Sequence, residues 1–146
     1  MKKIIVALAL ALAASAAMST EIGVSAVRDY NLNSTGARAT VSVDKISGFK
    51  PQASITSMSG AYNRYAVGAD YSFGSIGPVT FSGTGSGVFQ QTKNASSGYG
   101  LNAGLLASMP VYKNVSLDAS VERFFGQKRI SNFDGISTNV GLSAKF

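Results

Sequence analysis

Residues 135–146 read GISTNVGLSAKF, and this stretch alternates between two kinds of side chain. Successive side chains of a β-strand point to opposite faces of a sheet, so a period of two indicates a strand. One face of this strand is apolar, and the other face is small and polar apart from one lysine. The apolar face is formed by Ile136, Thr138, Val140, Leu142, Ala144 and Phe146.

The same period of two recurs in seven earlier segments, and no part of residues 18–146 shows an apolar stripe at helical spacing. Clusters of Gly, Asn, Asp, Ser and Pro separate the segments, and such clusters favour turns. The sequence therefore predicts eight strands joined by short connections. The seven earlier segments are residues 22–27, 37–44, 49–58, 64–73, 79–90, 99–109 and 115–122.

The chain begins with the features of an exported protein. Lys2 and Lys3 precede an apolar run over residues 4–14, and small residues follow it. This arrangement is typical of a secretory signal peptide. The alternative, a membrane-spanning anchor, needs an apolar run of about 20 residues. We therefore expect a signal peptide at residues 1–17, cleaved near residues 16–19, and a single domain over residues 18–146.

The composition argues against several classes of function. The chain has no Cys and no His, so it is not a disulfide scaffold and it lacks the usual general base and the commonest metal ligand. Gly83, Gly85 and Gly87 have the spacing G-x-G-x-G, whereas a dinucleotide-binding loop needs G-x-G-x-x-G before a helix. With 13 basic and 7 acidic residues, the chain is only mildly basic. We expect no catalytic residue, no cofactor, no metal and no nucleic-acid partner.

The residues on the polar faces of the predicted strands distinguish a soluble sandwich from a membrane barrel. They carry Gly, Ser, Thr and Asn together with too many ionisable groups for a dry soluble core. A transmembrane barrel places the apolar face in lipid and the polar face inside, and closure leaves no unpaired strand edge. The predicted fold class is all-β: an eight-stranded antiparallel up-and-down transmembrane β-barrel. An even number of strands puts both ends of the domain on one side of the membrane, the periplasmic side.

Aromatic residues gather near the predicted strand ends, where amphipathic rings favour the two membrane interfaces. The outer set is Tyr30, Tyr62, Tyr65, Phe89, Tyr99, Phe124 and Phe125, with Phe133 in the last outer loop. The inner set is Phe49, Tyr71, Phe73, Phe81, Tyr112 and Phe146.

The C-terminal strand resembles the assembly signal of bacterial outer-membrane barrels. The matching positions are Asn139, Gly141, Ala144 and the terminal aromatic Phe146, although Ala144 is smaller than the residue usual there. With eight strands, the whole of residues 18–146 resembles the small eight-stranded OmpA/OmpX/opacity-type family of bacterial outer-membrane β-barrels. The resemblance implies export to the outer membrane, folding by the outer-membrane assembly machinery with Phe146 as a contact, and a monomer.

The polar parity carries five charged side chains into the barrel, and we expect them to form an interior ion-pair network. Asp118 and Glu122 lie four residues apart on one strand, about 13 Å at 3.3 Å per residue, which is too far for a glycosidase carboxylate pair. Gly83, Gly85 and Gly87 fall on the lipid-facing parity, where they either permit curvature or leave a groove for a lipid chain or a partner. The expected network consists of Arg38, Arg64, Asp70, Asp118 and Glu122.

The favoured function is a structural or interaction role in the cell envelope. A narrow pore for small solutes or ions is the alternative, because eight strands leave an interior just wide enough for side chains. A lipid-modifying enzyme is less favoured, because the barrels of that kind use a histidine. We also expect Arg123, Lys128 and Arg129 at the outer rim to contact lipopolysaccharide, since a guanidinium binds phosphate and its stem packs on acyl chains. The alternative is that these three residues are ordinary solvated charges of a loop.

Overall fold

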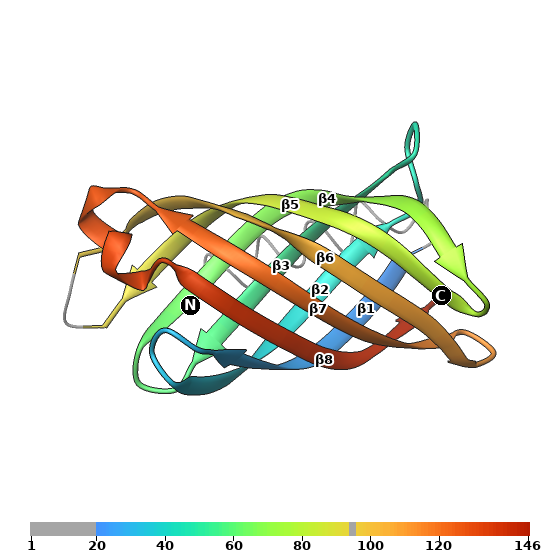
Figure 1. The fold of residues 1–146 in the computed structure, drawn as a ribbon, viewed down its shortest axis with the longest axis horizontal. Helices are drawn as coiled ribbons and strands as arrows, with labels where there is room; N and C mark the ends of the chain where they lie inside the picture. Colours follow the sequence, from blue (N-terminus) through green and yellow to red (C-terminus); the bar gives the residue numbers. More distant parts are fainter. Residues whose placement is uncertain (1–19, 94–95) are drawn as a thin grey trace.

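The computed structural model describes residues 20–93 and 96–146, without the side chains of Arg129 and Asn132. The predicted signal peptide lies outside the described residues. Eight antiparallel strands follow one another around a closed barrel, and β1 pairs with β8 to close it (Figure 1). This confirms the predicted eight-stranded antiparallel barrel. The strands are β1 (Thr20–Asp29), β2 (Ser34–Val43), β3 (Phe49–Met58), β4 (Tyr62–Ile76), β5 (Val79–Thr92), β6 (Gly98–Tyr112), β7 (Val115–Gly126) and β8 (Gly135–Lys145).

The two faces of the barrel wall have the polarity that the sequence predicts. Val67, Leu101 and Leu105 point outward and are 71%, 65% and 62% exposed. Ser42, Thr56 and other polar residues of the opposite parity are buried inside. The apolar atoms therefore cover the outside of the barrel, which is the reverse of a soluble β-sandwich.

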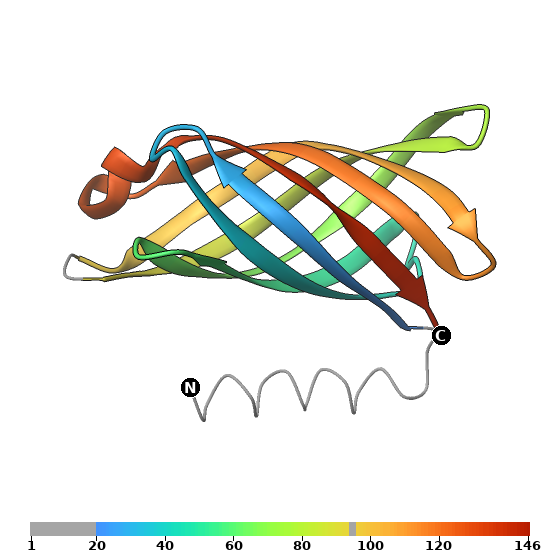
Figure 2. The same cartoon turned by 90° about the horizontal axis from the view of Figure 1, so that it is seen from below.

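The strands are unequal in length, and the longest are β4 and β6 with 15 residues each. Two irregularities interrupt their pairing, between Ser72 and Gly74 on β4 and between Pro110 and Tyr112 on β6. A bulge bends a strand and increases its local twist. The β4–β5 and β6–β7 hairpins extend at the same end of the barrel (Figure 2).

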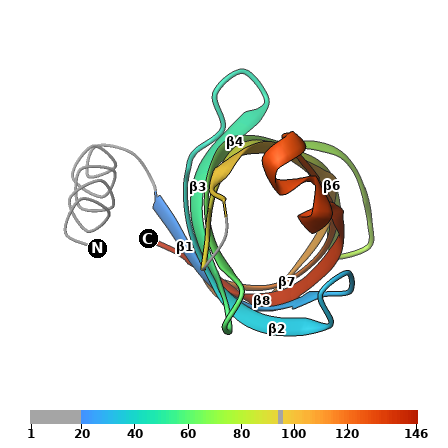
Figure 3. The same cartoon turned by 90° about the vertical axis from the view of Figure 1, so that its left-hand side faces the viewer.

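The two ends of the barrel differ. At one end, here called the η2 end, the 3₁₀-helix η2 (Lys128–Phe133) lies across the opening (Figure 3). At the other end, the terminal end, the backbone N–H of Phe146 donates to the carbonyl oxygen of Thr20 at 2.8 Å. The sequence predicts only a turn where η2 lies. Within residues 20–93 and 96–146, no helix is long and apolar enough to cross a membrane.

The aromatic residues occupy both ends, but not all of them face outward. On the outer surface, the Phe89 ring lies 6.3 Å from that of Tyr65 and 5.2 Å from that of Tyr99. Tyr62 and Phe124 lie at the same strand ends as the rest of the predicted outer set, but they point into the barrel and are each only 2% exposed. On β4 and β7, these two residues alternate in step with the polar residues, whose side chains point inward.

Candidate functional site

The lumen is filled with apolar side chains at the η2 end. Two clusters meet there, and η2 contributes to both of them. Ile130 of η2 is fully buried, and the ring of Phe133 packs edge-on against Tyr62 at a centroid distance of 5.8 Å. We call this set the plug: Val27, Met58, Tyr62, Val88, Phe124, Ile130 and Phe133.

Glycines on the inner faces of β6 and β7 make room for the plug. A Cβ atom at Gly100 would lie 2.6 Å from the Phe124 ring, and one at Gly126 would lie 2.8 Å from Ile130. Such contacts are too close for carbon atoms, so a larger residue would displace the plug. These glycines are therefore part of the structure that closes the lumen.

Arg64 lies directly against the plug, between two aromatic rings. Its guanidinium carbon is 4.1 Å from the Tyr62 ring centroid and 3.8 Å from that of Phe124. A guanidinium held between two ring faces makes favourable cation–π contacts. Its Nε donates to Gln90 at 2.8 Å, and the carbonyl oxygen of Phe133 accepts a second hydrogen bond at 3.4 Å. Arg64 thus ties β4 to β5 and to η2.

Arg38 and Glu122 form an ion pair inside the barrel. Arg38 donates to one Glu122 oxygen at 2.8 Å, and the two side chains are only 13% and 8% exposed. Asn102 donates to the other Glu122 oxygen at 2.8 Å, and Arg38 Nε donates to Thr56 at 2.8 Å. Such additional hydrogen bonds offset the cost of taking a buried pair out of water.

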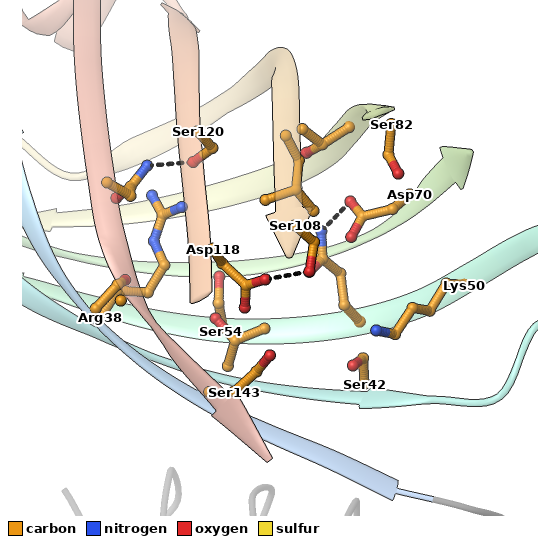
Figure 4. A pocket seen from close by; sticks show the side chains of 18 of the residues that line it. Arg38, Ser42, Lys50, Ser54, Asp70, Ser82, Ser108, Asp118, Ser120 and Ser143 are labelled. Atoms are coloured by element: carbon orange, nitrogen blue, oxygen red, sulfur yellow. Dashed lines mark hydrogen bonds between the residues drawn. The ribbon is translucent and has the colours of Figure 1, made fainter. Parts of the chain in front are cut away.

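The remaining length of the lumen is hollow. A cavity of about 290 Å³ runs from the Arg38–Glu122 pair towards the terminal end, where Glu21 and Lys45 line it. Serine and threonine are the most frequent residues in its wall, and several of the serines are labelled in Figure 4. Asp118 accepts a hydrogen bond from Ser108 at 2.5 Å, Asp70 accepts one from Gln52 at 2.7 Å, and Lys50 pairs with Glu21 at 2.8 Å.

Of the five residues expected to form one ion-pair network, the structure brings only Arg38 and Glu122 into a salt bridge. Arg64 is held by aromatic rings and an amide, whereas Asp70 and Asp118 have the neutral partners Gln52 and Ser108. The five side chains do all lie inside the barrel, but at different heights. Among the described residues, no group of three or more His, Cys, Asp or Glu is placed to hold a metal ion.

The residues expected to contact lipopolysaccharide lie at or near the η2 end. Arg123 is exposed on the outer face, with its guanidinium carbon 5.2 Å from the Phe125 ring centroid. Lys128 is exposed at the start of η2. The side chain of Arg129 lies outside the described part of the chain.

The four positions of the expected assembly signal lie on both faces of the last strand and just after it. Asn139 is buried inside and donates to Ser120 at 2.9 Å. A Cβ atom at Gly141 would lie 2.1 Å from the carbonyl oxygen of Val24, so only glycine fits there. Ala144 is partly exposed at the end of β8, and Phe146 is exposed beyond it.

Gly83, Gly85 and Gly87 face outward on β5, and a Cβ atom at any of them would meet nothing within 4 Å. The structure thus places them on the predicted face. The open space is compatible with both of the roles considered for them, curvature and a groove.

No protein-family model matches the chain. No curated protein sequence matches it either. Solved structures do resemble it, and one is the N-terminal β-barrel domain of Pseudomonas aeruginosa OprF, with a TM-score of 0.74 at 15% identity over 88% of this chain and 97% of that one.

Two further similar structures are those of NspA and Ail. Neisserial surface protein A (NspA) has a TM-score of 0.58 at 17% identity, covering 88% of this chain and 96% of that one. Yersinia pestis Ail, the attachment invasion locus protein, in complex with the heparin analogue sucrose octasulfate has a TM-score of 0.59 at 15% identity, covering 88% of this chain and 99% of that one. The chain therefore has the fold of small eight-stranded outer-membrane β-barrels.

Proposed function

We propose that the chain is an integral β-barrel of the bacterial outer membrane, with a structural or interaction role at the cell surface. The observation that carries this proposal is the distribution of polarity in the barrel wall. Exposed apolar side chains such as Val67 and Leu105 cover the outside, whereas the charged pair Arg38–Glu122 lies inside. This arrangement is stable in lipid and unfavourable in water.

The decisive test is folding in lipid. The chain without residues 1–17 is refolded into vesicles or uncharged detergent, and its gel mobility is compared before and after boiling. We expect β-type circular dichroism and a mobility that changes on boiling. A monodisperse protein that is folded without any detergent would contradict the proposal. Sedimentation in detergent tests the proposed monomer in the same preparation.

We further propose that the η2 end contacts the anionic head groups of lipopolysaccharide. Arg123 stacks beside Phe125 on the lipid-facing surface, so its charge can meet a phosphate while the ring packs on acyl chains. Lys128 and Arg129 follow at the rim. The similar Ail structure with a heparin analogue supports a polyanion as the class of ligand for a barrel of this shape.

A matched pair of triple variants tests this contact. Arg123, Lys128 and Arg129 are replaced with Gln in one protein, and Lys45, Lys113 and Lys145 are replaced with Gln in the other. We expect the first set to lose the thermal stabilisation that lipopolysaccharide gives over a neutral detergent, and the second set to keep it. Equal effects of the two sets would mean that Arg123, Lys128 and Arg129 are ordinary solvated charges without a specific contact to lipopolysaccharide.

We propose that the outer-membrane assembly machinery recognises the C-terminal strand through Asn139, Gly141, Ala144 and Phe146. Phe146→Ala should slow insertion into vesicles that contain the reconstituted machinery, while spontaneous folding in detergent keeps its rate. Equal slowing in both assays would mean that Phe146 serves only the folded barrel.

A narrow pore is the second candidate, and the cavity of about 290 Å³ is the observation that favours it. The plug argues against it, because the path ends at Arg64 and the rings of Tyr62 and Phe124. In planar bilayers we expect no large, steady currents from the wild-type protein. Such currents would favour a pore over a closed barrel with a structural or interaction role.

We propose no enzymatic activity for this chain. Turnover of lipopolysaccharide by the purified barrel would contradict this proposal.

A further inference from the structure

Two arginines on the outer face of the barrel share a local arrangement near the η2 end. Arg28 of β1 and Arg123 of β7 are both exposed, and each precedes an aromatic residue by two positions. The guanidinium carbon of Arg28 is 5.8 Å from the Tyr30 ring centroid, and that of Arg123 is 5.2 Å from the Phe125 ring centroid. Because such rings favour the membrane interface, we place both charges at the level of the lipid head groups.

The register of β7, β8 and β1 brings the two arginines onto one surface. Arg123 lies opposite Ile136 of β8, whose carbonyl oxygen accepts a hydrogen bond from the backbone N–H of Tyr30 at 3.1 Å. Arg28 lies opposite Thr138, two residues further along β8. Neighbouring strands lie about 4.8 Å apart and rise about 3.3 Å per residue, so the two arginine Cα atoms are about 10 to 12 Å apart. Only β8 separates the two positive charges.

Neither arginine is neutralised by the protein. Among the described residues, no carboxylate oxygen lies within 4.0 Å of Arg28 or Arg123. Their acidic neighbours in the sequence, Asp29 and Glu122, belong to the inward face and are buried. Arg28 donates to the neutral amide of Asn33 at 2.7 Å. The outer surface of β7, β8 and β1 therefore offers two cations to a ligand with two negative groups.

Hydroxyl groups lie beside these two charges. The Thr138 hydroxyl donates to that of Tyr30 at 3.4 Å, on the partly exposed outer surface. We propose that Arg28 and Arg123 bind the two phosphates of one lipopolysaccharide molecule, one phosphate each, with the sugars of its head group over β8. The inference rests on the proposed contact between the η2 end and lipopolysaccharide, and it adds Arg28 and a two-phosphate head group to that contact.

A head group with two phosphates fits this surface better than one with a single phosphate. A guanidinium binds phosphate through two parallel hydrogen bonds. The lipid anchor of lipopolysaccharide, lipid A, carries a phosphate at each end of a disaccharide. Once the first phosphate is bound, the second is held near the other arginine, which raises its effective concentration there. A phospholipid with one phosphate can engage only one of the two arginines.

The experiment compares lipid A that carries both phosphates with its monophosphorylated form. Each lipid is titrated in uncharged detergent into the folded barrel, and binding is followed by calorimetry. We expect the wild type to bind the bisphosphorylated form about tenfold more tightly, because a second charge-assisted contact contributes about that much. Phosphatidylglycerol, with one phosphate, should bind no more tightly than the monophosphorylated form.

Three single variants localise the effect, and their gel mobility before and after boiling shows that each is folded. We expect Arg28→Gln and Arg123→Gln each to bind the two forms of lipid A about equally. Lys93→Gln removes an exposed cation from the connection between β5 and β6 and should keep the preference. Equal binding of both forms by the wild type would overturn the inference, and so would a preference that survives in either arginine variant or disappears in Lys93→Gln.

The same titrations separate this inference from the contact on which it rests. If the wild type binds both forms of lipid A equally and Arg123→Gln weakens both, the contact with lipopolysaccharide stands and the two-phosphate mode is wrong. If the wild type binds neither form more tightly than phosphatidylglycerol, both proposals are wrong.

Discussion

The two halves of the lumen are built by the same eight strands and yet have opposite interiors. Towards η2, the inward positions carry Val27, Met58 and Phe124, which pack into the plug. Towards the terminal end, the inward positions carry small and polar residues, most often serine and threonine, around a cavity of about 290 Å³. The comparison shows that the same closed barrel wall can enclose either a packed or a hollow interior. The inward residues of each strand segment decide whether the lumen is closed or hollow.

The closed half also depends on a segment outside the wall. Ile130 and Phe133 come from η2 and complete clusters that the strands leave open. The Arg38–Glu122 pair marks the boundary between the halves, because it lies between the plug and the cavity. Paired substitutions of the same kind measure how different the two halves of the lumen, and the two faces of its wall, are.

The largest difference is expected between Glu122, at the boundary with the plug, and Glu21, at the open terminal end. Glu122→Gln leaves Arg38 as an uncompensated buried charge and should lower the free energy of unfolding by about 4 kcal/mol. Glu21→Gln breaks the Lys50 pair at the open terminal end, where water can replace it, and should cost about 1 kcal/mol or less. Urea unfolding in detergent, followed by circular dichroism, gives both values. Equal losses would remove the distinction between a closed and an open half.

A smaller difference is expected for an aliphatic residue in each half. Ile130 is fully buried, so Ile130→Ala should cost about 3 kcal/mol through lost burial and a cavity. Leu106 is only half-buried and lines the hollow half, so Leu106→Ala should cost clearly less. The same unfolding assay measures both changes. A larger loss for Leu106→Ala would mean that the terminal half is the better packed one.

The third pair, with the smallest loss expected for its inward-facing member, is a glycine on each face of the wall. Gly100→Ala places a methyl group 2.6 Å from the Phe124 ring and should cost about 2 kcal/mol by overpacking. Gly85→Ala meets nothing within 4 Å and should be neutral or stabilising by about 0.5 kcal/mol, because alanine loses less entropy in a strand. A clear loss for Gly85→Ala would show that the outer glycines are needed for curvature.

Most of the fold could be predicted from the period of two. All eight predicted segments are strands, and most of them extend a few residues further than the pattern showed. Closure of the sheet into a barrel could also be predicted, because only a closed barrel keeps the polar face and the strand edges away from lipid. The helix η2 was missed because six residues are too few for a helical period, and Ile130 and Phe133 gain their burial from the barrel.

The plug could have been predicted in part from the sequence. Val27, Met58, Val88 and Phe124 are apolar residues on the polar parity of four strands, each close to the η2 end. The ion pairing could not be predicted, because a period of two fixes the face of a residue but not its height relative to other strands. Register joins Arg38 to Glu122 across the lumen and places Asp118 beside Ser108.

The most direct test of the two-part lumen uses the absence of cysteine from the chain. Ser54→Cys places a single thiol in the hollow half, and Val88→Cys places one in the plug. The folded variants are treated with a small cationic methanethiosulfonate reagent, and labelling is followed by mass spectrometry. We expect the thiol at position 54 to react readily and the thiol at position 88 to stay protected until the barrel unfolds. Equal rates at the two positions would contradict a lumen that is plugged at one end and hollow at the other.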